Sequence, residues 1–256
     1  MSATVHSPAA TRPPTETMRR TARVAGILYL ITFVSIPTLQ LYGPVRDDAA
    51  FVLGAGSDTG VLWGALTEVI VALAGIGTAV TLFPVLKRQN EAAALGFVTT
   101  RLIEGAMIFV GVLSILSIAA LRHDMAGASG ADAASLVTTA TVLAGVYKWT
   151  MLLGQTLMRA LNALLLGSML YRSRLVPRIL PTLGLVGAPI LIASVIVGLF
   201  RINHPITVLA AVGTLPIAVW EFSLGVWLVV KGFKSSAVAE LPAVTTTPSA
   251  PASVAA

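Results

Sequence analysis

Long apolar runs separated by short polar connections dominate the chain between residues 19 and 234. A helix needs about 20 consecutive apolar residues to cross the hydrocarbon core of a bilayer. Six runs reach about that length, at residues 23–42, 61–86, 95–121, 150–171, 179–200 and 206–230. The short alternating segments of a membrane β-barrel are absent from the sequence. The pattern therefore predicts an all-α fold, a bundle of six transmembrane helices within a single domain, 19–234.

The two ends of the chain lack this apolar pattern. Residues 1–18 and 235–256 are rich in Ser, Thr, Pro and Ala, and this composition predicts disordered tails. Residues 133–147 are only mildly apolar. Two interpretations of them stay open, a helix on the outer surface or an extension of the fourth span.

Composition supports a protein whose main partner is the lipid bilayer. The 256 residues are 56% hydrophobic and 11% charged, with a mean hydropathy of +0.87, whereas soluble domains carry about 25% charged residues. A net charge of +6 can indicate nucleic-acid binding, but here the basic residues cluster between apolar runs, so we expect no nucleic acid. The sequence has no cysteine, which excludes disulfides and thiolate chemistry.

Lysine and arginine are unevenly distributed over the connections between spans. Eleven of them fall in the tails and connections on one side of the predicted bundle, and four fall on the other side. Because basic loops remain in the cytoplasm, this bias predicts that both termini are cytoplasmic. The first apolar run is too long for the core of a signal peptide, so we expect it to be retained as a membrane anchor.

Five ionisable residues fall inside the predicted spans, where a charge costs at least about 2.5–3.5 kcal/mol. Three of them, Glu104, Arg159 and Glu221, lie about 14–15 Å from a span edge, near the middle of a core about 30 Å thick. Gln155 and Asn162 share one helical face with Arg159. We therefore expect one interior polar cluster of seven residues, Glu68, Arg101, Glu104, Gln155, Arg159, Asn162 and Glu221.

Two interpretations of this cluster stay open. In the first, the glutamates and arginines neutralise one another and hold the helices in register, and removal of one partner costs about 3–5 kcal/mol. In the second, the cluster lines a polar pocket, and the one glutamate left over after pairing carries a proton. A structural bundle should be dry at the cluster, with every glutamate paired, whereas a transporter needs a cavity that reaches the midplane.

Enzyme chemistry has little support in the sequence. There is no H-E-x-x-H, no G-x-S-x-G and no glycine-rich nucleotide loop. His123 and His204, with Asp124 and Asp132 nearby, lack the tight spacing of metal ligands, so we expect no metal and no cofactor.

Aromatic residues gather near the ends of the predicted spans. Trp and Tyr commonly anchor membrane helices at the two interfaces with water. We expect that role for most of the following residues: Tyr29, Tyr42, Trp63, Tyr147, Trp149 and Tyr171.

Six blocks of sequence, in order, resemble one protein family. They are ARVAGILYLITF (22–33), LYGPV (41–45), PVLKRQNE (84–91), NALLLGSMLYRSRLVPR (162–178), LGLVGAP (183–189) and LPIAVWEFSLGVWLVVKGF (215–233). Together they resemble the Domain of Unknown Function 4386 family of bacterial integral membrane proteins, over about residues 19–234. The resemblance implies six helices in the cytoplasmic (inner) membrane of a bacterium. It implies no activity and no catalytic residue.

The sequence therefore predicts an integral membrane protein of unassigned activity. The first hypothesis is a structural or regulatory membrane component whose buried ion pairs hold the bundle together. The alternative is a small-solute or proton-coupled transporter that uses Glu104, Arg159 and Glu221. An intramembrane enzyme is a third hypothesis with less support, because no nucleophile or metal lies beside the charges. The ligand of the second hypothesis is a small molecule or a proton, and no protein partner is specified.

Overall fold

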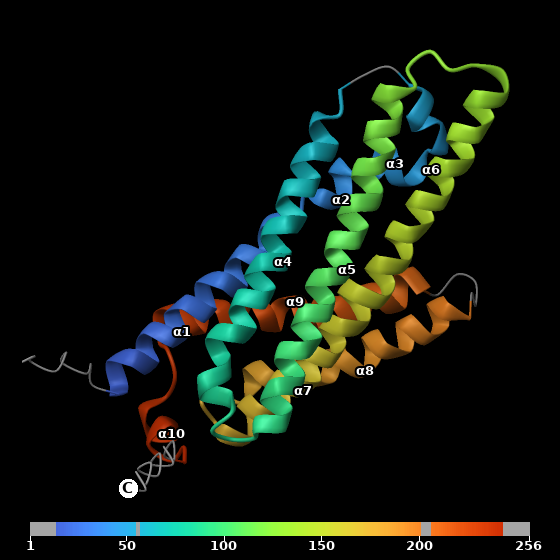
Figure 1. Ribbon diagram of the computed structural model, residues 1–256. Coiled ribbons are helices and arrows are strands. Elements are labelled where there is room, and N and C mark those ends of the chain that lie inside the picture. Colours follow the sequence, from blue (N-terminus) through green and yellow to red (C-terminus); the bar gives the residue numbers. More distant parts are fainter. Residues whose placement is uncertain (1–13, 55–56, 201–205, 243–256) are drawn as a thin grey trace, which may run out of the picture.

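The computed structural model describes residues 14–54, 57–200 and 206–242, and all regular secondary structure in these ranges is helical (Figure 1). Within these ranges, five helices are long and apolar enough to cross a membrane. They are Thr59–Leu86 (α4), Glu91–Asp124 (α5), a continuous helix Gly130–Ser173, Ile179–Leu199 (α8), and Val212–Val230 within α9 (Ile206–Val230). The all-α prediction is therefore confirmed for the described residues.

The first predicted span, 23–42, is not one continuous helix. It is divided among α1 (Pro14–Ile31), a 3-10 turn η1 (Thr32–Ser35) and α2 (Thr38–Leu41), and the chain then continues through α3 (Gly43–Asp47) and a second 3-10 turn, η2 (Ala49–Leu53). Thr32 and Ser35 donate hydrogen bonds to backbone carbonyls three residues earlier, at 2.6 and 3.3 Å. Such bonds compete with the helix, and Pro37 has no N–H with which to continue it. At 1.5 Å per residue α1 ends about 12 Å beyond Arg23, less than half way across the core of a bilayer.

Residues 133–147 extend the fourth predicted span. They belong to α6 (Gly130–Thr150), which continues through a π-helical stretch, η3 (Met151–Met158), into α7 (Arg159–Ser173). The 44 residues of this helix span more than about 60 Å, roughly twice the thickness of a bilayer core. π-Helical turns inside α-helices occur frequently at functional sites.

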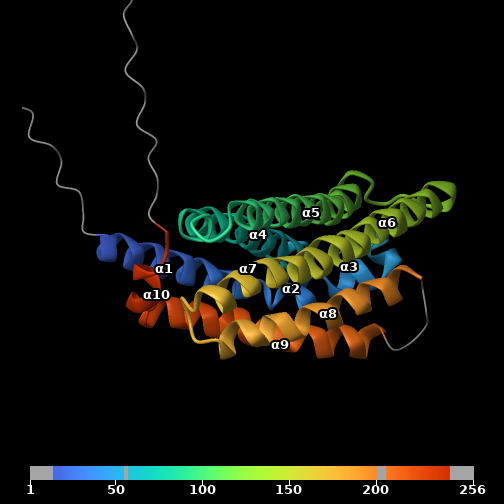
Figure 2. The same cartoon turned by 90° about the horizontal axis from the view of Figure 1, so that it is seen from below.

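Six helices form a closed ring. Going around it, α1 packs against α4, α4 against α5, α5 against α7, α7 against α8, α8 against α9, and α9 against α1. Figure 1 shows α4, α5 and α6 running side by side while α8 and α9 cross them obliquely. In the view from below (Figure 2), α4 and α5 lie on one side of the molecule, α8 and α9 on the other, and α7 lies between them. Since every helix of the ring has a neighbour on both sides, a space can be enclosed among them.

Two large apolar clusters lie at different heights of the bundle. One gathers at the end that holds the α4–α5 turn and includes Leu86, Phe97 and Leu175. The other gathers towards the opposite end and includes Tyr42 and Ile118. Along α4 and α5, the buried charges Glu68, Arg101 and Glu104 lie between these two clusters, next to a smaller apolar cluster that includes Val71 and Ile108.

The start of α1, the α4–α5 turn and α10 (Ser235–Ala239) lie at one end of the molecule (Figure 1). Arg88 of that turn donates to the carbonyls of Pro242 (2.8 Å) and Leu241 (3.1 Å), just after α10. Parts of both predicted tails are therefore ordered, because α1 begins at Pro14 and the segment 235–242 packs against the helix ends. The remaining tail residues, 1–13 and 243–256, lie outside the described residues.

Candidate functional site

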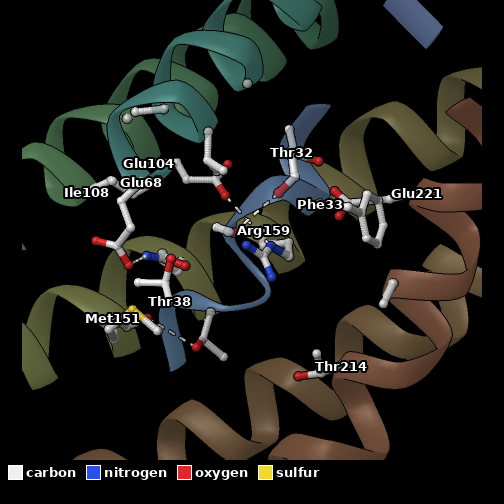
Figure 3. A pocket seen from close by; sticks show the side chains of 18 of the residues that line it. Thr32, Phe33, Thr38, Glu68, Glu104, Ile108, Met151, Arg159, Thr214 and Glu221 are labelled. Atoms are coloured by element: carbon white, nitrogen blue, oxygen red, sulfur yellow. Dashed lines mark hydrogen bonds and ion pairs between the residues drawn. The ribbon is translucent and has the colours of Figure 1, made fainter. Parts of the chain in front are cut away.

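A cavity of about 390 Å³ lies among these helices, at the level of Glu68 and Glu104 (Figure 3). Its wall comes from α4, α5, α6, η3, α7, α8 and α9, and from the break that follows α1. The lining includes six of the seven residues of the predicted polar cluster: Glu68, Arg101, Glu104, Gln155, Arg159 and Glu221. The seventh, Asn162, donates a hydrogen bond to the Glu104 carboxylate at 2.7 Å. The structure thus brings all seven together.

Arg101 of α5 links three helices. It is 5% exposed. Its Nη1 donates to Glu104 Oε2 at 3.0 Å, and its Nη2 donates to Glu221 Oε1 at 3.1 Å and to the Tyr29 hydroxyl at 3.3 Å. The rings of Tyr29 and Phe97 lie 5.5 and 5.8 Å from the guanidinium carbon, within the range of cation–π attraction. One side chain thereby connects α5 to α1 and α9.

Glu104 is the acid with the most partners in this network. Its Oε2 accepts from both Arg101 and Asn162, and its Oε1 lies 3.8 Å from Arg159 Nε. The carbonyl oxygen of the Asn162 side chain in turn accepts a hydrogen bond from Thr100. Around Arg101, two cations therefore face two carboxylates, and this half of the cavity is electrically balanced. Balanced and hydrogen-bonded charges are the kind that a buried site tolerates.

Glu68 of α4 has a different environment. It is 3% exposed, and its Oε1 accepts from the Tyr147 hydroxyl (3.2 Å) and from Gln155 Nε2 (3.4 Å). Its Oε2 is buried and has no hydrogen-bond partner within the described part of the chain. The ion pairs found among the described residues include none with Glu68. Among the described residues, Glu68 is therefore a buried carboxyl group without a countercharge, and an uncompensated buried charge is costly.

The π-helical stretch aligns the residues that α6, η3 and α7 contribute. Tyr147, Met151, Gln155 and Arg159 all line the cavity. In a regular α-helix with 3.6 residues per turn, Arg159 would be rotated by about 120° from Tyr147. The wider turns of η3 reduce that rotation, so one continuous helix can present a partner for Glu68 and a partner for Glu104 to the same cavity. In Figure 3, Glu68 and Met151 lie on one side, Glu221 and Thr214 on the other, and Arg159 between them.

Stripes of small residues bring α4 and α9 to the cavity. Ala72 and Gly75 line it one and two turns after Glu68, and Ala218 lines it just before Glu221. A Cβ at Gly75 would lie 3.7 Å from Arg101 Nη1, an ordinary van der Waals contact, so Arg101 lies directly against this part of α4. The small residues thus form part of the cavity wall beside the charged side chains.

The predicted interfacial role of the tyrosines is wrong for Tyr29, Tyr42 and Tyr147, all of which are buried. Tyr29 and Tyr147 donate or accept hydrogen bonds at the cavity, and the ring of Tyr42 packs edge-to-face on that of Tyr147 with centroids 5.4 Å apart. Their depth is hidden in the sequence because α1 begins early and the long helix extends beyond the predicted span. Trp63, Trp149 and Tyr171 are exposed, as anchors would be.

The histidines that were considered as metal ligands do not form a metal site in the described residues. His123 Nε2 lies 2.7 Å from Asp58 Oδ2, and Arg122 Nη1 lies 2.6 Å from Asp58 Oδ1. No group of three or more possible His, Asp or Glu ligands occurs within residues 14–54, 57–200 and 206–242. His204 lies outside these ranges. The Asp58 pairs connect the start of α4 to the end of α5.

Comparison with known proteins gives one match. The family model described as "Domain of unknown function (DUF4386)" matches residues 24–232, which is most of the chain and includes every cavity residue named above. No curated protein and no solved structure matches the chain.

Proposed function

This chain belongs to the DUF4386 family, and we propose that it is a carrier that exchanges protons for small organic cations across the cytoplasmic membrane of a bacterium. The observation that carries the proposal is the position of Glu68. It is a buried carboxyl group in the wall of a cavity, and its hydrogen-bond partners, Tyr147 and Gln155, are neutral. A proton or an organic cation can each neutralise this carboxylate, so the two ligands compete for one site. Competition for a single charge is the minimal requirement of an exchanger.

The composition of the cavity favours a small cation with apolar surface. A volume of about 390 Å³ falls within the range of about 300–1,000 Å³ that is typical of small-molecule sites. Apolar side chains such as Val71, Ile108 and Leu191 form much of the wall, and the Phe33 and Tyr147 rings offer π-faces to a cation. With Glu68 ionised, three acids face two arginines, and the site has a net negative charge.

The break after α1 supports movement around the site. Thr32, Phe33, Ser35 and Ile36 line the cavity and belong to or flank the short 3-10 turn. Interrupted helices commonly line midplane sites in transporters, and irregular backbone is tolerated at that depth where it borders a cavity. The excess of Lys and Arg at one end of the bundle supports a cytoplasmic location for that end and both termini.

A structural or regulatory role is the second candidate, and the Arg101 network favours it. The pairs of Arg101 with Glu104 and Glu221 hold α1, α5 and α9 together. That role accounts for the balanced half of the cavity. It accounts neither for the cavity itself nor for an acid without a cation.

The test is proton exchange by the purified full-length protein in liposomes that contain a pH-sensitive dye. The interior is made acidic and tetraethylammonium, a permanently charged probe that crosses lipid poorly, is added outside. We expect protein-dependent alkalinisation of the interior, reduced by at least about tenfold in Glu68→Gln, which corresponds to about 1.4 kcal/mol or more of lost interaction. The control is Glu91→Gln, the same substitution at an exposed glutamate, which should retain the wild-type rate.

Two outcomes would reject the carrier. One is an equal rate in wild type and Glu68→Gln. The other is no exchange with tetraethylammonium or with two further probes, tetramethylammonium and a benzyl-substituted ammonium ion, in protein whose fold is verified by its thermal unfolding.

A further inference from the structure

A second, polar pocket of about 480 Å³ lies at the basic end of the molecule and shares no lining residue with the cavity around Glu68. It forms where the α4–α5 turn meets the end of α7, the connection to α8 and the segment after α10. Its lining includes three arginines from one short stretch, Arg172, Arg174 and Arg178. The carrier hypothesis assigns no task to this pocket.

The charge of this basic pocket is unbalanced. Glu240 is the one acidic side chain in its lining, against three guanidinium groups. Among the described residues, no carboxylate forms an ion pair with Arg172, Arg174 or Arg178. Arg178 is held in place by its own neighbour, since its Nε donates to the Tyr171 carbonyl at 3.4 Å and its guanidinium lies 4.9 Å from the Tyr171 ring. The pocket therefore suits an anion.

Two neutral donors in the same lining lack partners. Gln89 Nε2 and Ser173 Oγ are buried and form no hydrogen bond within the described part of the chain. Buried donors normally have a partner, and each exception calls for a physical reason. A ligand that accepts hydrogen bonds in this pocket supplies that reason.

The backbone at Arg174 adds an independent observation. Arg174 ends α7 with φ of +55°, and it is the one non-glycine residue with positive φ in the described ranges. Glycine adopts this left-handed conformation without steric cost, and other residues do so at an energetic cost. The chain thus places an arginine, with its side chain at the pocket, where its backbone favours glycine.

We propose that the basic pocket binds a phosphate group. The fork of guanidinium donors matches the oxygens of a phosphate and binds them through two parallel hydrogen bonds, and the free amide and hydroxyl donors can complete the set. Because the pocket lies at the ends of membrane helices, the phosphate can belong to the headgroup of an anionic phospholipid or to a soluble phosphate. The two sources share the same chemistry, and they are separated by experiment.

The experiment uses the full-length protein in a zwitterionic detergent. Phosphatidylglycerol, phosphatidylcholine and inorganic phosphate are titrated separately, and the dissociation constant of each is measured. Wild type should bind phosphatidylglycerol or inorganic phosphate saturably and phosphatidylcholine at least about tenfold more weakly. Phosphatidylglycerol binding identifies a lipid headgroup as the source, whereas binding of inorganic phosphate without phosphatidylglycerol identifies a soluble anion. Binding of neither overturns the proposal.

Two triple variants separate a built site from general attraction to the basic end. The pocket variant combines Arg172→Gln, Arg174→Gln and Arg178→Gln. The control combines Arg20→Gln, Arg23→Gln and Lys231→Gln, which removes the same charge from exposed positions that do not line the pocket. We expect the dissociation constant to rise by at least about tenfold in the pocket variant and by less than about twofold in the control. Equal weakening in both variants overturns the proposal, because diffuse attraction depends only on net charge.

Two single variants keep the proposal testable if the pocket triple variant does not fold. Ser173→Ala leaves the charge unchanged and should raise the dissociation constant by about threefold or more if its hydroxyl donates to the ligand. Arg174→Gly removes the steric cost of the positive φ at this position, so it should raise the thermal unfolding midpoint. It also removes a guanidinium group from the pocket, so it should raise the dissociation constant by about threefold or more, as Ser173→Ala does. Wild-type affinity in both single variants overturns the proposal. The result of the proton-exchange test does not affect the test of phosphate binding, since the two sites share no lining residue. The carrier proposal and the phosphate proposal can therefore fail independently.

Discussion

The two halves of the cavity bury their acids in different ways. Around Arg101, Glu104 and Glu221 have cationic partners at 3.0 and 3.1 Å. Around Glu68, the partners are the hydroxyl of Tyr147 and the amide of Gln155. The three acids are about equally buried, at 3–7% exposure. The extent of burial therefore does not distinguish the three acids. What distinguishes them is whether a cationic side chain lies next to the carboxylate.

Because of this difference, the acids near Arg101 and the acid near Tyr147 are expected to have different roles in one cavity. A paired carboxylate holds helices together, and removing its partner strands a charge. A carboxyl group with neutral partners forms no ion pair that holds helices together, and in the proposed carrier it is the group that exchanges a proton. We therefore expect the loss of stability on substitution to be largest at Arg101, smaller at Glu104 and Glu221, and smallest at Tyr147 and Glu68.

The largest effect is expected for Arg101→Met. The substitution leaves Glu104 and Glu221 with Arg159, 3.8 Å from Glu104, as the nearest cation found in the structure. We expect a loss of about 3–5 kcal/mol in the free energy of unfolding, measured by titration with SDS in mixed micelles. The triple variant with Glu104→Gln and Glu221→Gln should recover most of the loss. A single-variant loss below about 1 kcal/mol contradicts the structural role of Arg101, because it falls in the range of exposed pairs.

The next effect distinguishes the two paired acids. Glu104→Gln removes the charge that faces both Arg101 and Arg159, and we expect it to cost about 2–3 kcal/mol. Glu221→Gln removes one ion pair and leaves Arg101 paired with Glu104, so we expect about 1–2 kcal/mol. The same SDS titration measures both. A larger loss for Glu221→Gln than for Glu104→Gln would mean that Glu221, on α9, is the main countercharge of Arg101.

The sequence could predict which residues form the cluster because depth follows from counting residues. The Lys and Arg at the span edges fix the register, and a rise of 1.5 Å per residue then puts Glu104, Arg159 and Glu221, which lie on three helices, near one level. Three predicted spans, 61–86, 179–200 and 206–230, lie within about two residues of α4, α8 and α9. These helices are continuous apolar segments whose ends have local signals.

The pairing within the cluster could not be predicted, because it depends on which helices are neighbours. The transporter hypothesis was centred on Glu104, Arg159 and Glu221, whereas the acid without a cation is Glu68. Tyr147, its partner, lies in the segment whose attachment to the fourth span stayed open. Sequence spacing within one helix gives Arg101 next to Glu104, but the contact of Arg101 with Glu221 joins residues that lie 120 positions apart.

Two backbone features had weak or no signals. Thr32 and Ser35 break the first helix through their own hydrogen bonds, but the same residues occur within intact membrane helices, as Ser114 and Thr78 do here. Residues 151–158 show no pattern that marks a π-helix in advance. Both features depend on packing around the cavity, which local propensity does not encode.

A smaller effect is expected for Tyr147→Phe. It removes the hydroxyl that donates to Glu68, and we expect a loss of about 1 kcal/mol in the free energy of unfolding. The matched control is Tyr42→Phe, because the Tyr42 hydroxyl is buried without a partner in the described residues and its ring packs on the same Tyr147. The control should be neutral or stabilising. Equal losses in the two variants would show that ring packing, and no hydrogen bond to Glu68, is being measured.

The smallest effect on stability is expected for Glu68→Gln. The substitution removes an acid that has no cation among the described residues, and the side-chain oxygen of glutamine can still accept from Tyr147. We expect the free energy of unfolding to change by no more than about 0.5 kcal/mol, against about 3–5 kcal/mol for Arg101→Met. A loss above about 2 kcal/mol would mean that Glu68 has a charged partner and belongs to the structural network. A variant that folds like wild type but has lost proton exchange would instead divide the cavity into a half that holds the helices and a half that binds the transported ions.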